Sequence, residues 1–378
     1  MRVGIPRETL LGETRVAATP ETVGKLRARG MEVLVERKAG DQAHFSDAAY
    51  AAAGVVLVDT ASALGAEVVF KVHKPTRDEI AQMKPGALLI GLLDICHDDG
   101  TWKALADQGV SALALELIPR ISRAQTMDVL SSQAGIAGYR AVLEGTRLYA
   151  RFFPLMMTSA GSAKPARVIV LGAGVAGLQA IATARRLGAQ VYAYDVRPEV
   201  KEQVHSLGAK FIELDIGESG AGAGGYAKKL SQDAQWREQA LLAEELKKAD
   251  VIVSTAQIPC MPAPVLITEE AVIGMRDGSV VIDMAAASGG NCPLTEQDKT
   301  LRKHGVILCG ISNYPALMPT DASNFYSRNV MNLLFHILDL GGGELDLTKA
   351  MEEDEIVGAS LIAHDGRQRW EPKIKKKE

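Results

Sequence analysis

The sequence VIVLGAGVAG at residues 168–177 combines an apolar run with three glycines spaced as G-x-G-x-x-G, and a helical pattern follows it. Gly172 permits a tight turn, Gly174 lets a pyrophosphate approach the backbone, and Gly177 lets strand and helix pack closely. A helix that begins at such a turn directs its backbone N–H groups at phosphate oxygens. The pattern predicts dinucleotide binding; the alternative is a strand–helix contact that needs the glycines for packing alone.

An acid ends the next predicted strand. Asp195 lies 18 residues after Gly177, near the spacing of about 20 at which dinucleotide-binding folds place the carboxylate that binds a ribose 2′-hydroxyl. Such a carboxylate repels a 2′-phosphate and favours NAD over NADP, whereas Arg197, two residues later, argues the other way.

Other candidate residues follow strands of the same region. Open α/β sheets bind ligands beyond the carboxyl ends of their strands, so residues 254–257, with Gln257, and 284–285 are expected to border the nucleotide, although both could be ordinary loops. The glycine-rich segment 217–225 with Tyr226 is either a slack surface loop or a lid that closes on the nucleotide.

A second group of polar residues reads PRISRAQTMDVLSSQ at 119–133. It follows an apolar strand and precedes a long helical pattern, so we expect it to lie at the cleft between two lobes, where ligands bind. The alternative is a solvated loop in which Ser131 or Ser132 caps the helix.

Composition excludes several classes of protein. The 378 residues are 47% hydrophobic with a net charge of −4, which predicts two globular domains and argues against nucleic-acid binding. The longest apolar runs are too short to cross a membrane, and four scattered cysteines with no apolar N-terminal segment predict a cytosolic protein. The seven histidines have no metal-binding spacing, and hydrolase and kinase motifs are absent, so we expect no metal site.

The elements that must position these residues form two α/β sets. Apolar runs predict strands at 2–6, 32–36, 55–58, 68–72, 87–93 and 112–117, and again at 167–171, 190–194, 210–214, 250–255, 279–284 and 306–309. Helical patterns lie between them, and long helices at 132–151 and 321–340, the latter capped by Asp321, join the two sets.

The predicted fold is therefore α/β, with two Rossmann-like doubly wound parallel-sheet domains joined by long helices and the cofactor cleft between them. The first domain is discontinuous, 1–131 with 320–378, because the last piece, with strands at 355–357 and 361–363, has no core of its own. The second domain is 132–319 and binds the nucleotide.

Together, VGIPRE at 3–8, the segment 119–142, YDVR at 194–197, GGYAKK at 224–229 and IDMAAASGGNCPL at 282–294 resemble the NAD(H)-binding domain I of proton-translocating nicotinamide nucleotide transhydrogenases. In bacteria with a split enzyme this domain is a separate α1 subunit. The resemblance implies hydride transfer between NADH here and NADP⁺ on the β subunit, coupled to proton translocation by the membrane subunits. It also implies a homodimer, a membrane α2 subunit and an NADP(H)-binding β subunit as partners, and a peripheral location on the cytoplasmic face of the inner membrane.

The resemblance also implies roles for single residues. Asp128 and Ser131 would lie near the nicotinamide carboxamide, Arg120 near the ring and phosphate, and Gln125 toward the partner's nucleotide, while Tyr226 would belong to a mobile loop that closes over the cofactor. The full set expected to bind NAD(H) is Arg120, Ile121, Ser122, Arg123, Gly172, Ala173, Gly174, Val175, Gly177, Asp195, Val196, Arg197, Gly225, Tyr226 and Gln257.

Alanine dehydrogenase is the rival resemblance, since it shares the opening motif and Arg15. Its Lys, His and Asp correspond here to His73, Asp94 and Ala287. A dehydrogenase that oxidises an amine needs a general acid or base, whereas exchange between two nicotinamides moves a hydride alone. His73 and Asp94 could form a new acid/base pair, so an alanine-dehydrogenase-like amino-acid dehydrogenase stays an alternative, as does a regulatory NAD-binding protein without turnover.

Overall fold

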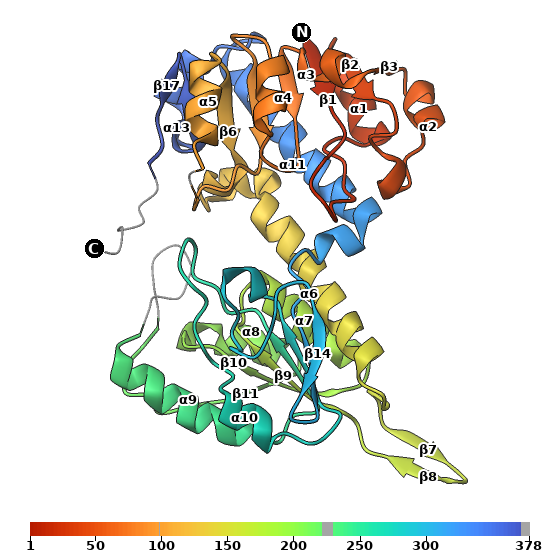
Figure 1. Ribbon diagram of the computed structural model, residues 1–378, viewed down its shortest axis with the longest axis vertical. Coiled ribbons are helices and arrows are strands. Elements are labelled where there is room, and N and C mark those ends of the chain that lie inside the picture. The colour runs from red at the N-terminus through yellow and green to blue at the C-terminus, as the bar shows by residue number, and fades with distance from the viewer. Residues whose placement is uncertain (98, 221–229, 372–378) are drawn as a thin grey trace. The chain divides into compact units, whose positions relative to one another are not determined.

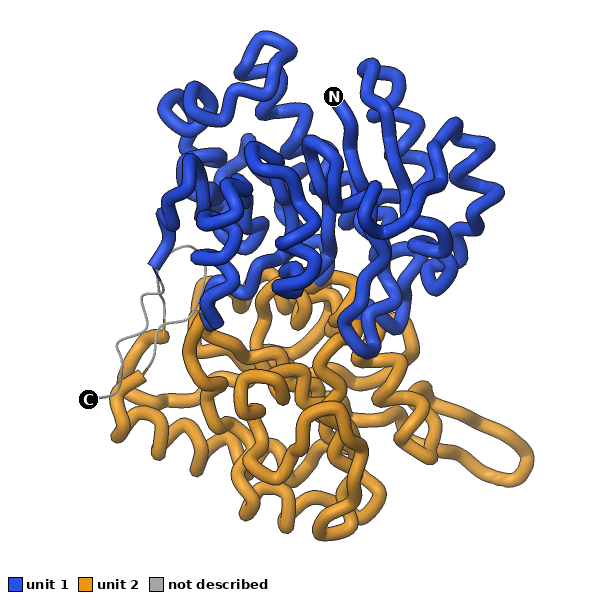
Figure 2. Tube along the Cα trace, turned by 45° about the horizontal axis from the view of Figure 1, so that its top comes forward, with its two compact units in different colours: residues 1–133, 315–378 blue, residues 134–314 orange. Residues whose placement is uncertain are grey.

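The computed structural model describes residues 1–97, 99–220 and 230–371 and divides the chain into two compact units. Unit 1 consists of residues 1–133 and 315–378, and unit 2 of residues 134–314 (Figure 2). The predicted divisions were after 131 and before 320. The second division comes earlier because Tyr314 is buried in the core of unit 2, whereas the Ala316 carbonyl accepts a hydrogen bond from Thr14 in unit 1.

Unit 1 contains an eight-stranded sheet in the order β17-β16-β6-β5-β4-β1-β2-β3. Its six central strands are parallel, and the last two are antiparallel additions at one edge. The C-terminal segment thus returns to the first sheet, as predicted. The strands are β1 (Arg2–Ile5), β2 (Glu32–Glu36), β3 (Val56–Val58), β4 (Val68–Phe70), β5 (Leu88–Gly91), β6 (Ser111–Ala114), β16 (Leu361–His364) and β17 (Arg367–Gln368).

Helices cover both faces of this sheet, which explains why its strands are continuous apolar runs. Val68 and Phe70 of β4 point into a core shared with α1 (Pro20–Ala28) and α11 (Pro319–Leu340), while Val69 points into a second core on the opposite face. The remaining helices of unit 1 are α2 (Asp47–Ala52), α3 (Thr60–Leu64), α4 (Arg77–Gln82), α5 (Thr101–Asp107), α12 (Leu347–Glu353) and α13 (Glu355–Ser360).

Three helix predictions for this unit were wrong in detail. The predicted strand 355–357 is part of α13, because the Asp354 carboxylate accepts the N–H groups of Ile356 and Val357 and so caps a helix. Helix α11 begins at Pro319, whose fixed φ suits the first turn, so Asp321 lies inside that turn and is not the cap. Since α11 lies wholly in unit 1, only α6 (Val129–Leu148) continues as a helix through a division between the units.

Unit 2 contains a seven-stranded sheet in the order β11-β10-β9-β12-β13-β15-β14 (Figure 1). The first six are parallel in the order 3-2-1-4-5-6, which is the dinucleotide-binding arrangement. The edge strand β14 pairs antiparallel with β15 and was not predicted. The strands are β9 (Arg167–Leu171), β10 (Gln190–Tyr194), β11 (Lys210–Phe211), β12 (Val251–Ser254), β13 (Val280–Asp283), β14 (Thr300–Lys303) and β15 (Val306–Cys309).

Alternate residues of β9 also face two cores. Val168 and Val170 pack with α7 (Val175–Arg186), whereas Ile169 and Leu171 pack with α9 (Gln232–Leu246). Helices α8 (Lys201–Ser206) and α10 (Glu269–Gly274) complete the unit. This two-sided packing fixes β9, and with it the glycine turn at its end.

A separate hairpin extends from unit 2. Strands β7 (Met156–Thr158) and β8 (Gly161–Ala163) pair only with each other among the described residues, and Figure 1 shows them as a projecting arm. Leu155 and Met157 in this arm are 56% and 76% exposed. No helix in the described parts of the chain is long and apolar enough to cross a membrane.

Candidate functional site

The turn between β9 and α7 needs each glycine for a different reason. Gly172 has φ +88°, and a Cβ there would lie 2.7 Å from Thr255 Oγ1. A Cβ on Gly177 would collide with the carbonyl oxygen of Gly172, so strand and helix pack in direct contact. A Cβ on Gly174 would meet nothing within 4 Å. Gly174 is also the N-cap of the 12-residue α7 and has no side chain to cap it, so open space and helix N–H groups coincide there, which fits a pyrophosphate.

The carboxylate of Asp195 is buried at the end of β10 and is tied to this turn. The N–H of Ala173 donates to Oδ2 at 2.7 Å. Arg197 donates its own N–H and its Nε to Oδ1, at 2.9 and 2.8 Å, and its Nη2 to Oδ2 at 2.7 Å. The hydrogen bonds to Asp195 raise the pKa of Arg197. Asp195 therefore stands where the sequence predicted an acid, with Arg197 as its ion-pair partner.

A cavity of about 310 Å³ opens beside Asp195. This volume is at the lower end of the range for small-molecule pockets. Besides Tyr194 and Asp195, the residues that line it lie after β10 and in or after β11; they are Val196, Pro198, Phe211, Ile212, Glu213, Leu214, Asp215, Ile216, Gly217, Glu218 and Ser219.

A buried carboxyl lies behind the same strand. Tyr194 donates its hydroxyl to Glu238 Oε1 at 2.9 Å, and both side chains are buried. Burial raises the pKa of Glu238 to about 7, and the charge of Asp195 acts in the same direction, although the Tyr194 hydrogen bond opposes both. This carboxyl therefore titrates near neutral pH.

Two loops that follow β12 and β13 are joined by a buried polar network. Asn291 accepts from Ser254 Oγ at 2.6 Å and donates to the carbonyls of Ala256 and Pro264 at 2.9 and 2.8 Å. Asp283 accepts the N–H groups of Ala285, Asn291 and Cys292 at 3.0–3.1 Å. The network fixes the chain at the strand ends where ligands of this fold bind.

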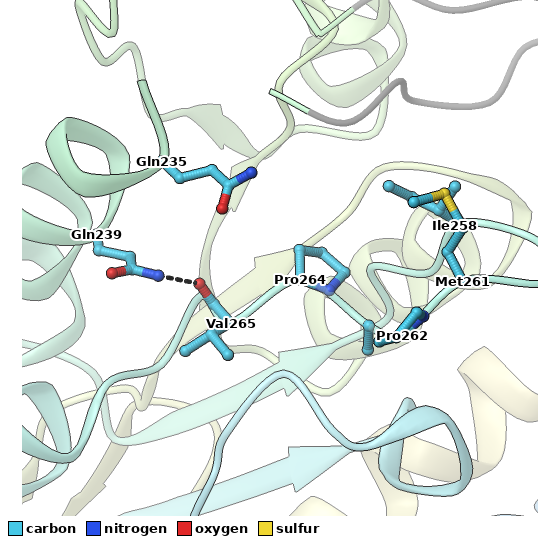
Figure 3. A pocket seen from close by; sticks show the side chains of 8 residues that line it. Gln235, Gln239, Ile258, Met261, Pro262, Pro264 and Val265 are labelled. Carbon is cyan, nitrogen blue, oxygen red and sulfur yellow. Dashed lines mark hydrogen bonds between the residues drawn. The ribbon is translucent and has the colours of Figure 1, made fainter. Parts of the chain in front are cut away.

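Gln257 lies on the first of these loops and donates to the Met284 carbonyl at 3.3 Å, so the two predicted strand-end segments are neighbours. The same loop forms one wall of a second cavity, of about 250 Å³, whose other wall is α9. Figure 3 shows Gln235 and Gln239 of α9 opposite Met261 and Val265, with Gln239 Nε2 donating to the Val265 carbonyl at 2.8 Å.

In unit 1, the segment 119–133 is largely ordered by hydrogen bonds. Residues Ser122–Met127 form a 3₁₀ helix, and the Thr126 carbonyl accepts from Asn329 and Asn332 of α11. Asp128 accepts the N–H and the hydroxyl of Ser131, so the cap of α6 is Asp128 and not Ser131 or Ser132. The predicted loop is thus a fixed turn that leads into α6, and α6 begins at Val129, three residues earlier than predicted.

The predicted nicotinamide residues differ in exposure along this turn. Arg120 and Gln125 are exposed, whereas Asp128 and Ser131 are half-buried and bonded to each other. Ser122 is exposed and Ile121 packs against the unit 1 core. Arg123 forms ion pairs with Asp354 and Glu355, so its side chain anchors the turn to the start of α13.

The residues at the alanine dehydrogenase positions do not form the acid/base pair considered above. His73 Nε2 lies 2.6 Å from Glu13 Oε2, and Glu13 also accepts two hydrogen bonds from Arg15. Burial alone would raise the pKa of Glu13, but the bonds from Arg15 and His73 hold it well below its usual range. Asp94 instead pairs with Lys74 at 3.3 Å and His97 at 3.0 Å.

Two predicted residues, Gly225 and Tyr226, lie outside the described residues. In the other direction, Asp283, Asn291 and Glu238 were not predicted as single functional residues. A polar residue that ends an apolar strand, as in VVID, was the available signal for Asp283.

Residues 4–137 match the N-terminal domain of the alanine dehydrogenase/PNT family, and residues 141–371 match its C-terminal domain. This chain is a member of the alanine dehydrogenase/PNT family. Within the family it is 47% identical over 375 residues to the first of the separately encoded pieces of the NAD(P) transhydrogenase subunit alpha of Rhodospirillum rubrum, with 97% of each chain covered.

Solved structures of the family agree with this. The crystal structure of a transhydrogenase from Sinorhizobium meliloti is 40% identical, with a TM-score of 0.85 over 97% of this chain and 98% of that one. An L-alanine dehydrogenase structure is 26% identical, with a TM-score of 0.82 over 97% and 96%. The chain is therefore more similar to these transhydrogenase proteins than to this dehydrogenase.

Proposed function

We propose that this chain is the NAD(H)-binding α subunit of a proton-translocating NAD(P) transhydrogenase. In this function a hydride passes directly between NADH bound here and NADP⁺ bound on the β subunit, and the membrane subunits couple the transfer to proton translocation. The 47% identity over nearly the whole of a transhydrogenase α subunit chain carries the proposal. The glycine turn with open space at Gly174 and the acid at Asp195 support the choice of ligand.

Bound NAD supplies the hydride chemistry, and the chain supplies binding and orientation. The turn at Gly172–Gly177 and the N-terminus of α7 hold the pyrophosphate, and Asp195 holds the adenosine ribose. Asp128 and Ser131 orient the nicotinamide carboxamide, Arg120 binds near the ring and phosphate, and Gln125 reaches toward the partner's nucleotide. Transfer between two rings needs them about 3–3.5 Å apart with water excluded, and it needs no proton carrier.

The pairing of charges in unit 1 supports hydride exchange over amino-acid oxidation. A dehydrogenase requires a base that is free to take the substrate's proton. Here His73 is hydrogen-bonded to Glu13, Arg15 is occupied by Glu13 and Gln133, and Asp94 is paired with Lys74 and His97. Ala287, at the third dehydrogenase position, cannot carry a proton.

We propose a homodimer as the form of the subunit, with the membrane α2 subunit and the NADP(H)-binding β subunit as its further partners. Through them it would lie on the cytoplasmic face of the inner membrane without inserting into it. The exposed Leu155 and Met157 of the β7–β8 arm offer an apolar surface that association with a second copy would cover.

The test is hydride transfer from NADPH to an NAD⁺ analogue of distinct absorbance. The chain is assayed alone, then with the NADP(H)-binding domain of the β subunit, and with alanine plus NAD⁺ as a control. Turnover only when both proteins are present supports the proposal. Turnover of alanine by the chain alone would make it an amino-acid dehydrogenase, and NADH binding without turnover in either assay would make it a regulatory NAD-binding protein.

A variant pair sharpens this test. Gln125→Ala is expected to slow hydride transfer at least about tenfold with little change in NADH affinity, because this side chain acts on the alignment of the two rings. Thr126→Ala, at the next exposed position, is the matched control and should retain the wild-type rate. Equal losses of rate and affinity in Gln125→Ala would reduce the segment to a binding surface.

A further inference from the structure

The carboxylate of Asp195 has no free acceptor position. Its Oδ1 receives the N–H and Nε of Arg197, and its Oδ2 receives the N–H of Ala173 and Nη2 of Arg197, all at 2.7–2.9 Å. Two carboxylate oxygens offer about four acceptor sites. A ribose hydroxyl can therefore bind Asp195 only if one of these donors leaves.

The donors differ in how easily they can leave. The N–H groups of Ala173 and Arg197 belong to the backbone at the glycine turn and the end of β10 and are fixed by the fold. The guanidinium is the end of a flexible side chain and is 11% exposed in the ion pair, against 4% for the Asp195 side chain. The guanidinium of Arg197 is therefore the group that gives way.

The pair also changes how the site treats a 2′-phosphate. A bare carboxylate would repel it, but Asp195 and Arg197 together are neutral, and a freed guanidinium is a strong bidentate phosphate ligand. Exclusion of NADP(H) then depends on Asp195 keeping the guanidinium to itself. The acidic residues Glu213, Asp215 and Glu218, which line the same cavity, add a weaker repulsion.

We propose that Arg197 is a specificity-determining residue of the dinucleotide site, a 2′-phosphate ligand that Asp195 withholds in a buried bidentate ion pair. When NADH binds, the adenosine ribose replaces the guanidinium on Asp195. This inference rests on the proposed function only in requiring that NAD(H) binds at this site.

The test is a double-mutant cycle of Asp195→Asn and Arg197→Gln in the full chain. Dissociation constants are measured for NADH and NADPH, and for ADP and 2′,5′-ADP, which carry the adenosine end alone. The quantity compared is the ratio of the NADPH to the NADH constant, since effects on the shared parts of the nucleotides cancel in it.

Asp195→Asn is expected to weaken NADH binding and to strengthen NADPH binding about 10- to 100-fold, the worth of a charge-assisted hydrogen bond to phosphate. The double variant should lose that gain, because the guanidinium is gone. Arg197→Gln alone should raise the ratio, since an unpaired carboxylate remains. 2′,5′-ADP should follow NADPH, and ADP should follow NADH.

Lys201→Gln is the matched control, because Lys201 pairs with Glu213 of the same cavity at 2.7 Å and does not touch Asp195. Its ratio should stay near the wild-type value, which separates the ion pair from a general loss of positive charge. Arg197→Lys keeps the charge without the planar fork and should give an intermediate ratio. Thermal unfolding of each variant shows that it is folded.

Two outcomes would overturn the proposal. One is an equal NADPH constant in Asp195→Asn and the double variant, which would leave Arg197 without a role. The other is an Arg197→Gln variant that loses NADH affinity as much as Asp195→Asn, which would make the arginine a direct ligand of NADH. Absence of NADH binding by the unaltered chain would instead overturn the proposed function.

Discussion

Replacing Asn291 by alanine tests the network that fixes the loops after β12 and β13. Asn291 is fully buried, and its side chain forms three hydrogen bonds, to Ser254 Oγ and to the carbonyls of Ala256 and Pro264. Alanine would leave all three partners without this bond in a buried site. Each buried unsatisfied group costs about 1–3 kcal/mol, and water entering the cavity returns part of it, so we expect a loss of about 3–5 kcal/mol in unit 2.

Gln239→Ala is the matched control. Gln239 donates a single hydrogen bond to the Val265 carbonyl of the same loop, but at the surface, where water can replace it (Figure 3). Its loss should cost no more than about 1 kcal/mol. The comparison therefore isolates burial from the mere presence of an amide.

Because the two units need not unfold together, calorimetry is combined with hydrogen exchange on peptides covering residues 254–265 and 283–292. Asn291→Ala should speed exchange in both peptides and weaken NADH binding. If exchange in 254–265 is unchanged, or if the two variants cost the same, the network does not hold these loops and the reasoning is refuted.

Three further predictions concern other regions of the chain. Because burial raises the pKa of Glu238 to about 7, the folded protein holds this proton more tightly than the unfolded chain; its contribution to stability is complete below about pH 4.5 and is lost as the pH rises to about 7. Glu238→Gln should remove that component of the pH dependence in urea titrations at pH 5, 6, 7 and 8, and a parallel pH profile would contradict the assignment. Asp128→Ser should retain the cap of α6, with a change in stability under about 1 kcal/mol, yet slow hydride transfer at least about tenfold; an unchanged rate would limit Asp128 to capping. Leu155→Ser with Met157→Ser should shift the subunit toward monomer in analytical ultracentrifugation, and an unaltered dimer would remove the arm from the interface.

Local signals and long-range contacts account for different features of this fold. The glycine turn, α1 with Pro20 at its start, and the apolar strands could all be predicted, because their signals lie within a few consecutive residues. Predictions failed where a short segment fits two structures. Residues 355–357 have an apolar run typical of a strand, and only the bonds of Asp354 with the following N–H groups make them a helix. Strand β14 reads TLRK, half polar because it lies at an edge, so it gave no apolar signal.

The sequence by itself determined the α/β architecture of two sheets, the position of the glycine turn, the acid at 195 and the resemblance to transhydrogenases. It could not determine what each polar group binds. The partners of Asn291 are 37, 35 and 27 residues away, and Ala173 reaches Asp195 across 22. Such partners meet only when the strands stand side by side in the sheet, because a hydrogen bond requires atoms within about 3 Å, which spacing along the chain does not reveal. The saturation of Asp195 by Arg197, and with it the proposed basis of nucleotide choice, was therefore decided by the tertiary structure alone.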